Sequence, residues 1–83
     1  MTPSGERRRS HAMLAVEQER NAQDAKWGEQ NHPNLLWLGI LGEEFGEVSK
    51  ALIEGDPIDH VREELVQVAA VCVAWLECLE RNE

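Results

Sequence analysis

The stretch of sequence that determines the fold is residues 35–81, which read LLWLGILGEEFGEVSKALIEGDPIDHVREELVQVAAVCVAWLECLER. It holds two runs of apolar residues that recur at intervals of three and four, with a turn signal between them. The first run consists of Leu38, Leu41, Phe45, Val48 and Leu52. The second run consists of Val61, Leu65, Val68, Cys72, Trp75 and Leu79. This spacing is typical of amphipathic helices and predicts one helix over residues 35–54 and another over residues 57–81.

The residues that connect these helices predict the end of the first helix and the beginning of the second. Gly55 predicts the end of the first helix, and Asp56 and Pro57 predict an N-cap and a first helical position. Asn34 is expected to cap the first helix. Because the connection is short, the two helices should run antiparallel. The second helix is apolar over much of its circumference and must be covered on more than one side. We therefore predict an all-α homo-oligomer, a homodimer or homotetramer, in which these two helices form half of a four-helix bundle.

The N-terminal part of the chain predicts a third helix. Residues 10–26 contain good helix formers without Gly or Pro, Ser10 is a suitable N-cap and Gly28 a suitable terminator. Its apolar stripe is weak, so we expect it to pack less deeply than the others. Residues 1–9 are polar and basic and are predicted to be a flexible lead-in. Residues 10–83 are then a single helical domain.

Composition excludes several classes of function. The net charge is −8, from 16 acidic residues against eight Lys and Arg, and this balance repels polyanions such as nucleic acids. Cys72 and Cys78 are spaced neither as a zinc-ligand pair nor as a redox pair, which predicts reduced thiols. No apolar run approaches the roughly 20 residues of a membrane span, and the first residues lack the apolar core of a secretion signal. We expect a cytoplasmic protein without a nucleic-acid or membrane partner.

Acidic residues adjoin the apolar stripes in matched pairs. Glu44 and Glu47 are three residues apart, as are Glu64 and Gln67, so each pair lies on one face of its helix. In an antiparallel hairpin Glu47 and Glu64 lie at similar distances from the turn, which brings four oxygen-bearing side chains together. Oxygen ligands suit Mg²⁺, with Mn²⁺ as a possible substitute. We interpret the set as a metal site; the alternative is that these acids only face solvent.

These residues also resemble a known motif. Residues 43–47 (Glu-Glu-Phe-Gly-Glu) and residues 64–67 (Glu-Leu-Val-Gln) are similar to the signature of the MazG-like all-α nucleoside triphosphate pyrophosphohydrolases, in which Glu-Glu-x-x-Glu precedes Glu-x-x-Asp. Residues 23–33 resemble the segment ahead of the acidic helix in small phage and mobile-element members, and the resemblance covers roughly residues 14–80. It implies Mg²⁺-dependent hydrolysis of a (deoxy)nucleoside triphosphate to monophosphate and pyrophosphate, with a role in nucleotide-pool house-cleaning.

The resemblance also implies roles for individual residues. Glu44, Glu47 and Glu64 would be metal ligands, with Gln67 as the fourth member of the set. Glu43, or alternatively Glu63, would either support the metal ligands from outside or position the attacking water. Glu43 and Glu47 are the predicted catalytic residues.

Gln67 is the departure from the motif, because it offers a neutral carbonyl oxygen where the family has a charged ligand. Three interpretations follow: a tolerated variant, which we favour because the other acids are intact, an acid supplied from another position, or a lost activity. The third would leave a catalytically weak helical oligomer that binds nucleotides or a protein partner.

The substrate contacts are predicted around the ends of the helices. Trp27 and His32 are candidates to stack on or hydrogen-bond the base, and Lys26 and Lys50 are candidates to contact phosphate oxygens. The alternatives are that Trp27 covers the end of the bundle, that His32 is an ordinary loop residue, and that Lys50 forms a surface ion pair.

Overall fold

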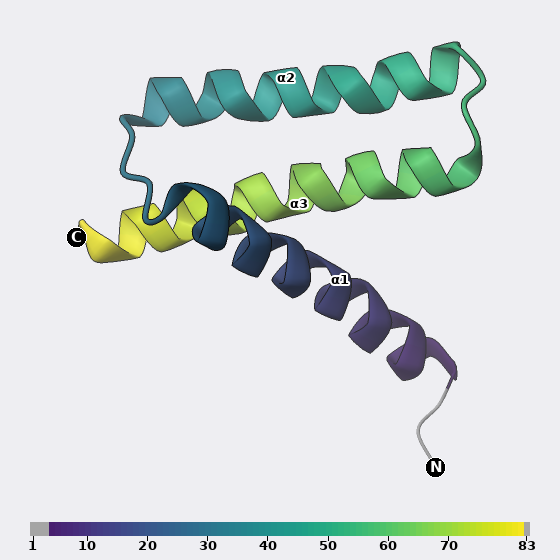
Figure 1. The fold of residues 1–83 in the computed structure, drawn as a ribbon, viewed down its shortest axis with the longest axis horizontal. Helices are drawn as coiled ribbons and strands as arrows, with labels where there is room; N and C mark the ends of the chain where they lie inside the picture. Colours follow the sequence, from purple (N-terminus) through teal and green to yellow (C-terminus); the bar gives the residue numbers. More distant parts are fainter. Residues whose placement is uncertain (1–3, 83) are drawn as a thin grey trace.

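The computed structural model describes residues 4–82, which form three α-helices and contain no β-strand (Figure 1). The helices are α1 (Ser4–Trp27), α2 (Asn34–Ile53) and α3 (Ile58–Arg81). The all-α prediction with three helices is confirmed for this part of the chain. Among the described residues, no helix is long and apolar enough to cross a membrane.

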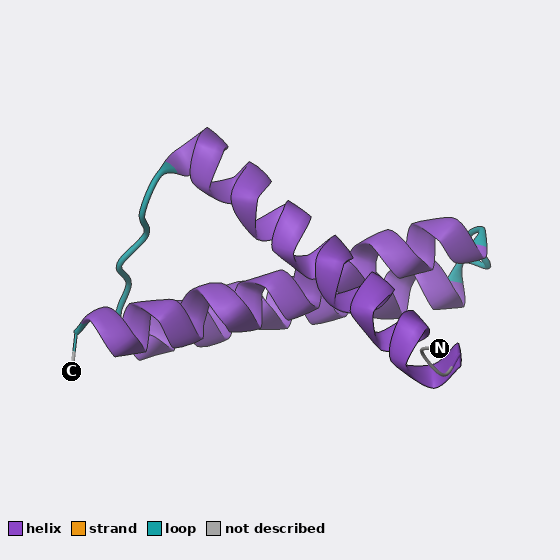
Figure 2. Cartoon of the chain, turned by 90° about the horizontal axis from the view of Figure 1, so that it is seen from below, coloured by secondary structure: helices purple, strands orange, loops and turns teal. Residues whose placement is uncertain are grey.

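The helices α2 and α3 lie side by side and antiparallel, as the short connection predicts (Figure 1). Gly55 ends the first of them at a φ of 70°, and Gly28 follows α1 at a φ of 71°. Only glycine adopts this left-handed conformation without strain, so both terminators act as the sequence predicts. Within residues 4–82, α1 contacts α3 but not α2, and Figure 2 shows it crossing the hairpin at a steep angle.

Two predicted N-caps are wrong. The N-cap positions of α2 and α3 are occupied by Pro33 and Pro57, whose fixed φ and extended ψ suit a residue that only half belongs to the helix. Asn34 accepts a hydrogen bond from the indole nitrogen of Trp75 at 2.9 Å, which ties the start of α2 to α3. The carboxylate of Asp56 lies 3.1 Å from a ring nitrogen of His60. Each side chain therefore has a partner other than the helix end.

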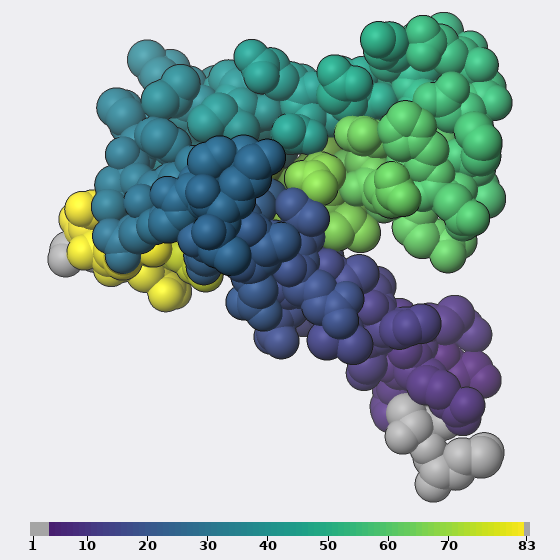
Figure 3. All heavy atoms as spheres, viewed as in Figure 1, coloured from purple at the N-terminus to yellow at the C-terminus, as the bar shows by residue number. Residues whose placement is uncertain are grey.

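The first helix is longer than the sequence predicts. It begins at Ser4 rather than Ser10, so residues 4–9 are helical and not a flexible lead-in, and residues 1–3 lie outside the described part of the chain. Glu6 in the first turn favours the helix N-terminus, and the arginines that follow are good helix formers. None of the described residues of α1 is buried, which confirms its shallow packing. Its N-terminal half stands away from the hairpin (Figure 3).

The core lies at the open end of the hairpin, away from the turn. It is formed by Trp37, Val71, Ala74 and Cys78, with Ile40, Leu41 and Trp75 packed around them. Val48 and Val61 of the predicted apolar runs are also buried, but Leu38, Phe45, Leu52 and Leu65 are each more than half exposed. The direct contact between the helices uses residues that precede these by one position, such as Trp37 and Ala51. About half of each predicted run therefore takes part in the packing within the chain, and the exposed members are displaced to one side of the hairpin.

Candidate metal centre

The predicted acids lie in the half of the hairpin nearer the turn. Glu44 lies seven residues from both Trp37 and Ala51, which are 1% and 2% exposed, so it belongs to the stripe of α2 that faces α3. Its side chain is half-buried there, as are Glu64 and Gln67 on α3. The equivalent positions seven residues before and seven residues after Glu44 are therefore occupied by core residues.

Several acidic side chains surround Glu44. The pKa of its carboxyl group is raised above its ordinary value, first by partial burial and then by the charges of Glu64, Glu47, Glu43 and, from α1, Glu19. Glu47 and Glu64, the other two predicted acidic ligands, thus lie close enough to Glu44 for their charges to act on it. Gathered carboxylates destabilise the fold unless a proton or a cation neutralises them, which is the electrostatic setting of a cation site.

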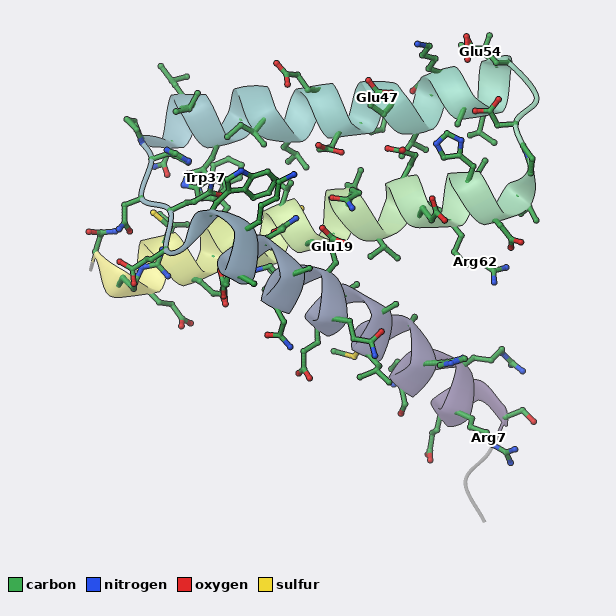
Figure 4. The ribbon with its side chains drawn as sticks, viewed as in Figure 1. Arg7, Glu19, Trp37, Glu47, Glu54 and Arg62 are labelled. Carbon is green, nitrogen blue, oxygen red and sulfur yellow. The ribbon has the colours of Figure 1, made fainter. Side chains whose placement is uncertain are left out.

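Glu19 is a member of this acidic group that no sequence motif marks. Glu19, Glu63 and Gln67 line the same groove of about 710 Å³ between α1 and α3. Figure 4 shows Glu19 on α1 and Glu47 on α2, the two helices that pack against α3. Glu19 is hydrogen-bonded by the side-chain amide of Gln23 at 3.3 Å. Only the crossing of α1 over α3 brings this carboxylate near the acids, so spacing along the sequence gives no sign of it.

The donor atoms fit Mg²⁺ in their chemistry but do not form a complete cage. Within residues 4–82, no three Asp, Glu, His or Cys side chains stand close enough together to hold an ion between them. Mg²⁺ commonly keeps several waters and is held by one or two carboxylates together with substrate phosphates. The half-buried carboxylates of Glu44 and Glu64 are two ligands of this kind, and the remaining acids lie around them.

His60 is the second residue that the sequence reasoning left unassigned. Its two ring nitrogens lie 3.1 Å from Glu64 Oε1 and 3.1 Å from Asp56 Oδ2. The hydrogen bond to Glu64 is the main cause that raises the pKa of His60, and the charges of Asp56, Glu64 and Glu63 add to it. Spacings of four on each side of His60 put these groups on one helix face, so the sequence did contain the signal.

The predicted substrate residues lie mostly at the other end of the molecule. Lys26 and Trp27 contact each other at the end of α1, with the ammonium nitrogen 4.6 Å from the ring centroid, and Trp27 is 57% exposed. His32 lies edge-on to Trp37, with 4.9 Å between ring centroids. Lys50 is exposed on α2. The recorded contacts of Lys26, Trp27 and His32 are therefore not with the acids.

Ion pairs fix α1 and the loop that follows it onto α3. Arg20 of α1 binds Glu77 of α3, with its Nε 3.0 Å from the carboxylate, and also pairs with Asp24. Arg81 donates to the backbone oxygen of Gln30 at 2.9 Å. These contacts help to hold α1 where it crosses α3, and hence to hold Glu19 near the acids.

No family model matches this chain. Searches of curated proteins and of solved structures also found no match. The resemblance to the MazG-like enzymes therefore rests on the residues quoted from the sequence.

Proposed function

We propose that this protein hydrolyses (deoxy)nucleoside triphosphates to a monophosphate and pyrophosphate with Mg²⁺ as cofactor. The observation that carries the proposal is that several other acidic side chains surround Glu44, which is half-buried on the side of α2 that faces α3. An apolar residue there would stabilise the helix pair, whereas isolated acids are costly to bury. The resemblance of residues 43–47 and 64–67 to the MazG-like signature supports the same reaction.

In this proposal the acids divide into ligands and a water-positioning group. Glu44 and Glu64 would hold the cation, Glu47 would reach it through a change of side-chain rotamer, and the carbonyl oxygen of Gln67 would add a neutral ligand. Bound Mg²⁺ neutralises the triphosphate and lowers the pKa of a bound water. Glu43, which is exposed on α2 beside Glu44, orients the water that attacks the α-phosphorus.

The proposed substrate contacts use residues that lie mostly apart from the acids. Lys26 and Trp27 form a paired cation and aromatic surface to which a nucleotide would bind by phosphate contact and stacking. His32 and Lys50 remain candidates for base and phosphate contacts. Assembly of α2 and α3 with a second copy into a four-helix bundle, and a cytoplasmic location, also belong to the proposal.

Hydrolysis of a panel of dNTPs and NTPs with Mg²⁺, with products resolved by chromatography, tests the reaction. We expect monophosphate and pyrophosphate, and loss of turnover in Glu47→Gln with unchanged helical content by circular dichroism. Glu54→Gln, which changes an acid at the end of the same helix, is the matched control and should retain activity. Turnover that persists in Glu47→Gln would show that Glu47 is not a ligand.

A second candidate function is a catalytically weak helical protein that binds nucleotides or a protein partner. The neutral Gln67 and the incomplete cage favour it. The melting temperature in Mg²⁺ or Mn²⁺ separates the two, since a ligand of the native state stabilises by mass action. A rise with either ion supports the metal enzyme. An unchanged melting temperature, together with no nucleotide hydrolysed, would leave the binding function.

A further inference from the structure

One side of the α2–α3 hairpin carries a row of exposed apolar side chains at heptad spacing. We call it the heptad face, and its members are Leu38, Phe45 and Leu52 on α2 and Leu65, Cys72 and Leu79 on α3. The five members other than Cys72 are between 38% and 64% exposed. Residues seven apart lie on one stripe of a helix, because seven residues complete about two turns. Each helix therefore presents a continuous apolar stripe along its length.

The two stripes lie on the same side of the hairpin. Each member directly follows a residue of the contact side: Phe45 follows Glu44, and Leu79 follows the buried Cys78. One position turns a helix by about 100° in a fixed sense. In an antiparallel pair of helices, this rotation, measured from the side that forms the contact, places both stripes on the same side of the hairpin. α1 packs on α3 near Val66 and Val73, with Leu65 of the heptad face at the border of this contact, and α1 does not reach α2.

The size of this face suits a protein interface. A strip as long as a 20-residue helix is about 30 Å long, and two packed helices are roughly 20 Å wide, which gives about 600 Å² per copy. Two such faces would bury about 1,200 Å² in total, the lower end for specific complexes. Isolated soluble chains seldom leave a contiguous apolar patch of this extent in water.

The pattern of the face identifies its occupant. Leu38 and Leu52 lie seven residues on either side of Phe45, so the stripe reads the same in both directions. A twofold axis at Phe45 would bring Leu38 of one copy against Leu52 of the other, as a symmetric interface requires. Phe45 lies eight residues before Ile53 and Leu65 seven after Ile58, the residues that flank the turn, so Phe45 and Leu65 are nearly level. On α3 the same axis would bring Cys72 of one copy against the exposed Ile58 of the other, because these two residues lie seven positions on either side of Leu65.

The rest of α2 favours the same occupant. Gly39, Gly42 and Gly46 adjoin the stripe, and a Cβ added at any of them would meet nothing within 4 Å. Each costs up to about 1 kcal/mol relative to Ala in a helix, and no contact within the chain requires it. Such a flat surface permits close approach of a second helix. The face also carries no charge, so two copies of a chain with net charge −8 can meet there without repulsion between like charges.

We propose that a second copy of this chain covers the heptad face, with α2 antiparallel to α2 of the partner copy and Phe45 at the twofold axis. The proposal specifies the surface and register of the four-helix bundle. It does not rest on hydrolysis, because the argument uses no acid of the metal centre.

The mass of the full chain in solution tests the proposal. Light scattering after gel filtration, without nucleotide, should give twice the 9.4 kDa chain mass. Phe45→Glu places a carboxylate against its own copy and should raise the dissociation constant at least 100-fold, while circular dichroism stays unchanged. The matched control is Leu36→Glu, because Leu36 is 49% exposed on another side of α2, and its mass should equal the native mass. A native monomer, or a Phe45→Glu dimer as tight as the native one, would overturn the proposal.

Cross-linking tests the register separately. In a Cys72→Ser background, Phe45→Cys should form a covalent dimer under mild oxidation, because the two thiols meet at the axis. Leu36→Cys in the same background should stay monomeric on a denaturing gel. A covalent dimer from Leu36→Cys but not from Phe45→Cys would show that the copies meet through a different side of α2.

Discussion

The two halves of the α2–α3 hairpin use equivalent helix positions in opposite ways. At the open end, Trp37 fills the contact between the helices and is packed by Val71, Ala74 and Cys78. One heptad nearer the turn, the same stripe carries Glu44, whose neighbours are other acids. The first half stabilises the fold by burying apolar surface. Nearer the turn Val48, Ala51 and Val61 are also buried, but the position of Glu44 buries no apolar side chain. A residue that lowers stability in this way is expected at a functional site.

The open end should therefore carry most of the stability. Trp37→Ala removes the largest buried side chain and should cost about 3–5 kcal/mol of unfolding free energy, measured by urea denaturation. Its indole N–H meets no acceptor with hydrogen-bond geometry, so the loss is one of packing, although the N–H lies close enough to the Cys78 sulfur to lower the pKa of that thiol.

Trp27→Ala is the matched control, since Trp27 is 57% exposed and its loss should cost little. Equal costs for the two tryptophans would contradict the assignment of the core to the open end of the hairpin.

The acidic half should respond in the opposite direction. Without metal, Glu44→Gln removes a carboxylate whose pKa is raised by burial and by its acidic neighbours, so the melting temperature should rise by roughly 2–4 °C. The same variant should lose the stabilisation by Mg²⁺ that the native chain is expected to show.

Glu17→Gln is the control for a general effect of net charge, because Glu17 is an exposed acid of α1 outside the group that acts on Glu44. A fall in the melting temperature of metal-free Glu44→Gln would mean that this carboxylate stabilises the fold and that the repulsion is unimportant.

Glu19 and Gln67, which line the groove between α1 and α3, allow a test of whether one acid compensates for the missing charge of the other position. If Glu19 compensates for the missing charge at position 67, Glu19→Gln should weaken Mg²⁺ binding about tenfold, and Gln67→Asp in the same chain should restore it. Titration calorimetry with Mg²⁺ or Mn²⁺ measures both. Independent effects of the two substitutions would mean that these side chains do not share an ion.

Much of this arrangement can be predicted from the sequence. Local signals decide the helices: Gly55 and Gly28 end them, and the spacing of the acids on α2 and α3 puts Glu44 and Glu64 on facing sides. The start of α1 was missed because Pro3 and Gly5 suggested a flexible segment. The side of each helix that forms the contact was predicted only in part: Leu41, Val48, Val61 and Trp75 of the predicted runs pack inside the chain, whereas Phe45 and its equivalents do not. A heptad stripe is equally consistent with packing inside the chain and packing between chains.

The contribution of Glu19 depends on tertiary structure alone. Its position follows from the angle at which α1 crosses α3, which the Arg20–Glu77 ion pair and the hydrogen bond from Arg81 to the backbone of Gln30 help to hold. Glu19 and the acids of α2 and α3 are so far apart in the chain that no periodic spacing connects them. The Arg20–Glu77 pair likewise has no motif, although both residues are common helix formers on exposed faces.

The pH dependence of stability should show the smallest effect and should come from the acidic half. His60 has a raised pKa because Glu64 and Asp56 favour its charged form, so its contribution is fully present below its ordinary pKa of 6.5. That contribution is lost as the pH rises through the higher pKa of the folded state. The melting temperature should therefore fall slightly between about pH 6 and pH 8 in metal-free buffer, and this slope should disappear in His60→Gln. His11→Gln, in the part of α1 that stands away from the hairpin, should keep the slope. If His60→Gln keeps it as well, the bridge from Asp56 to Glu64 through His60 does not contribute to stability in solution.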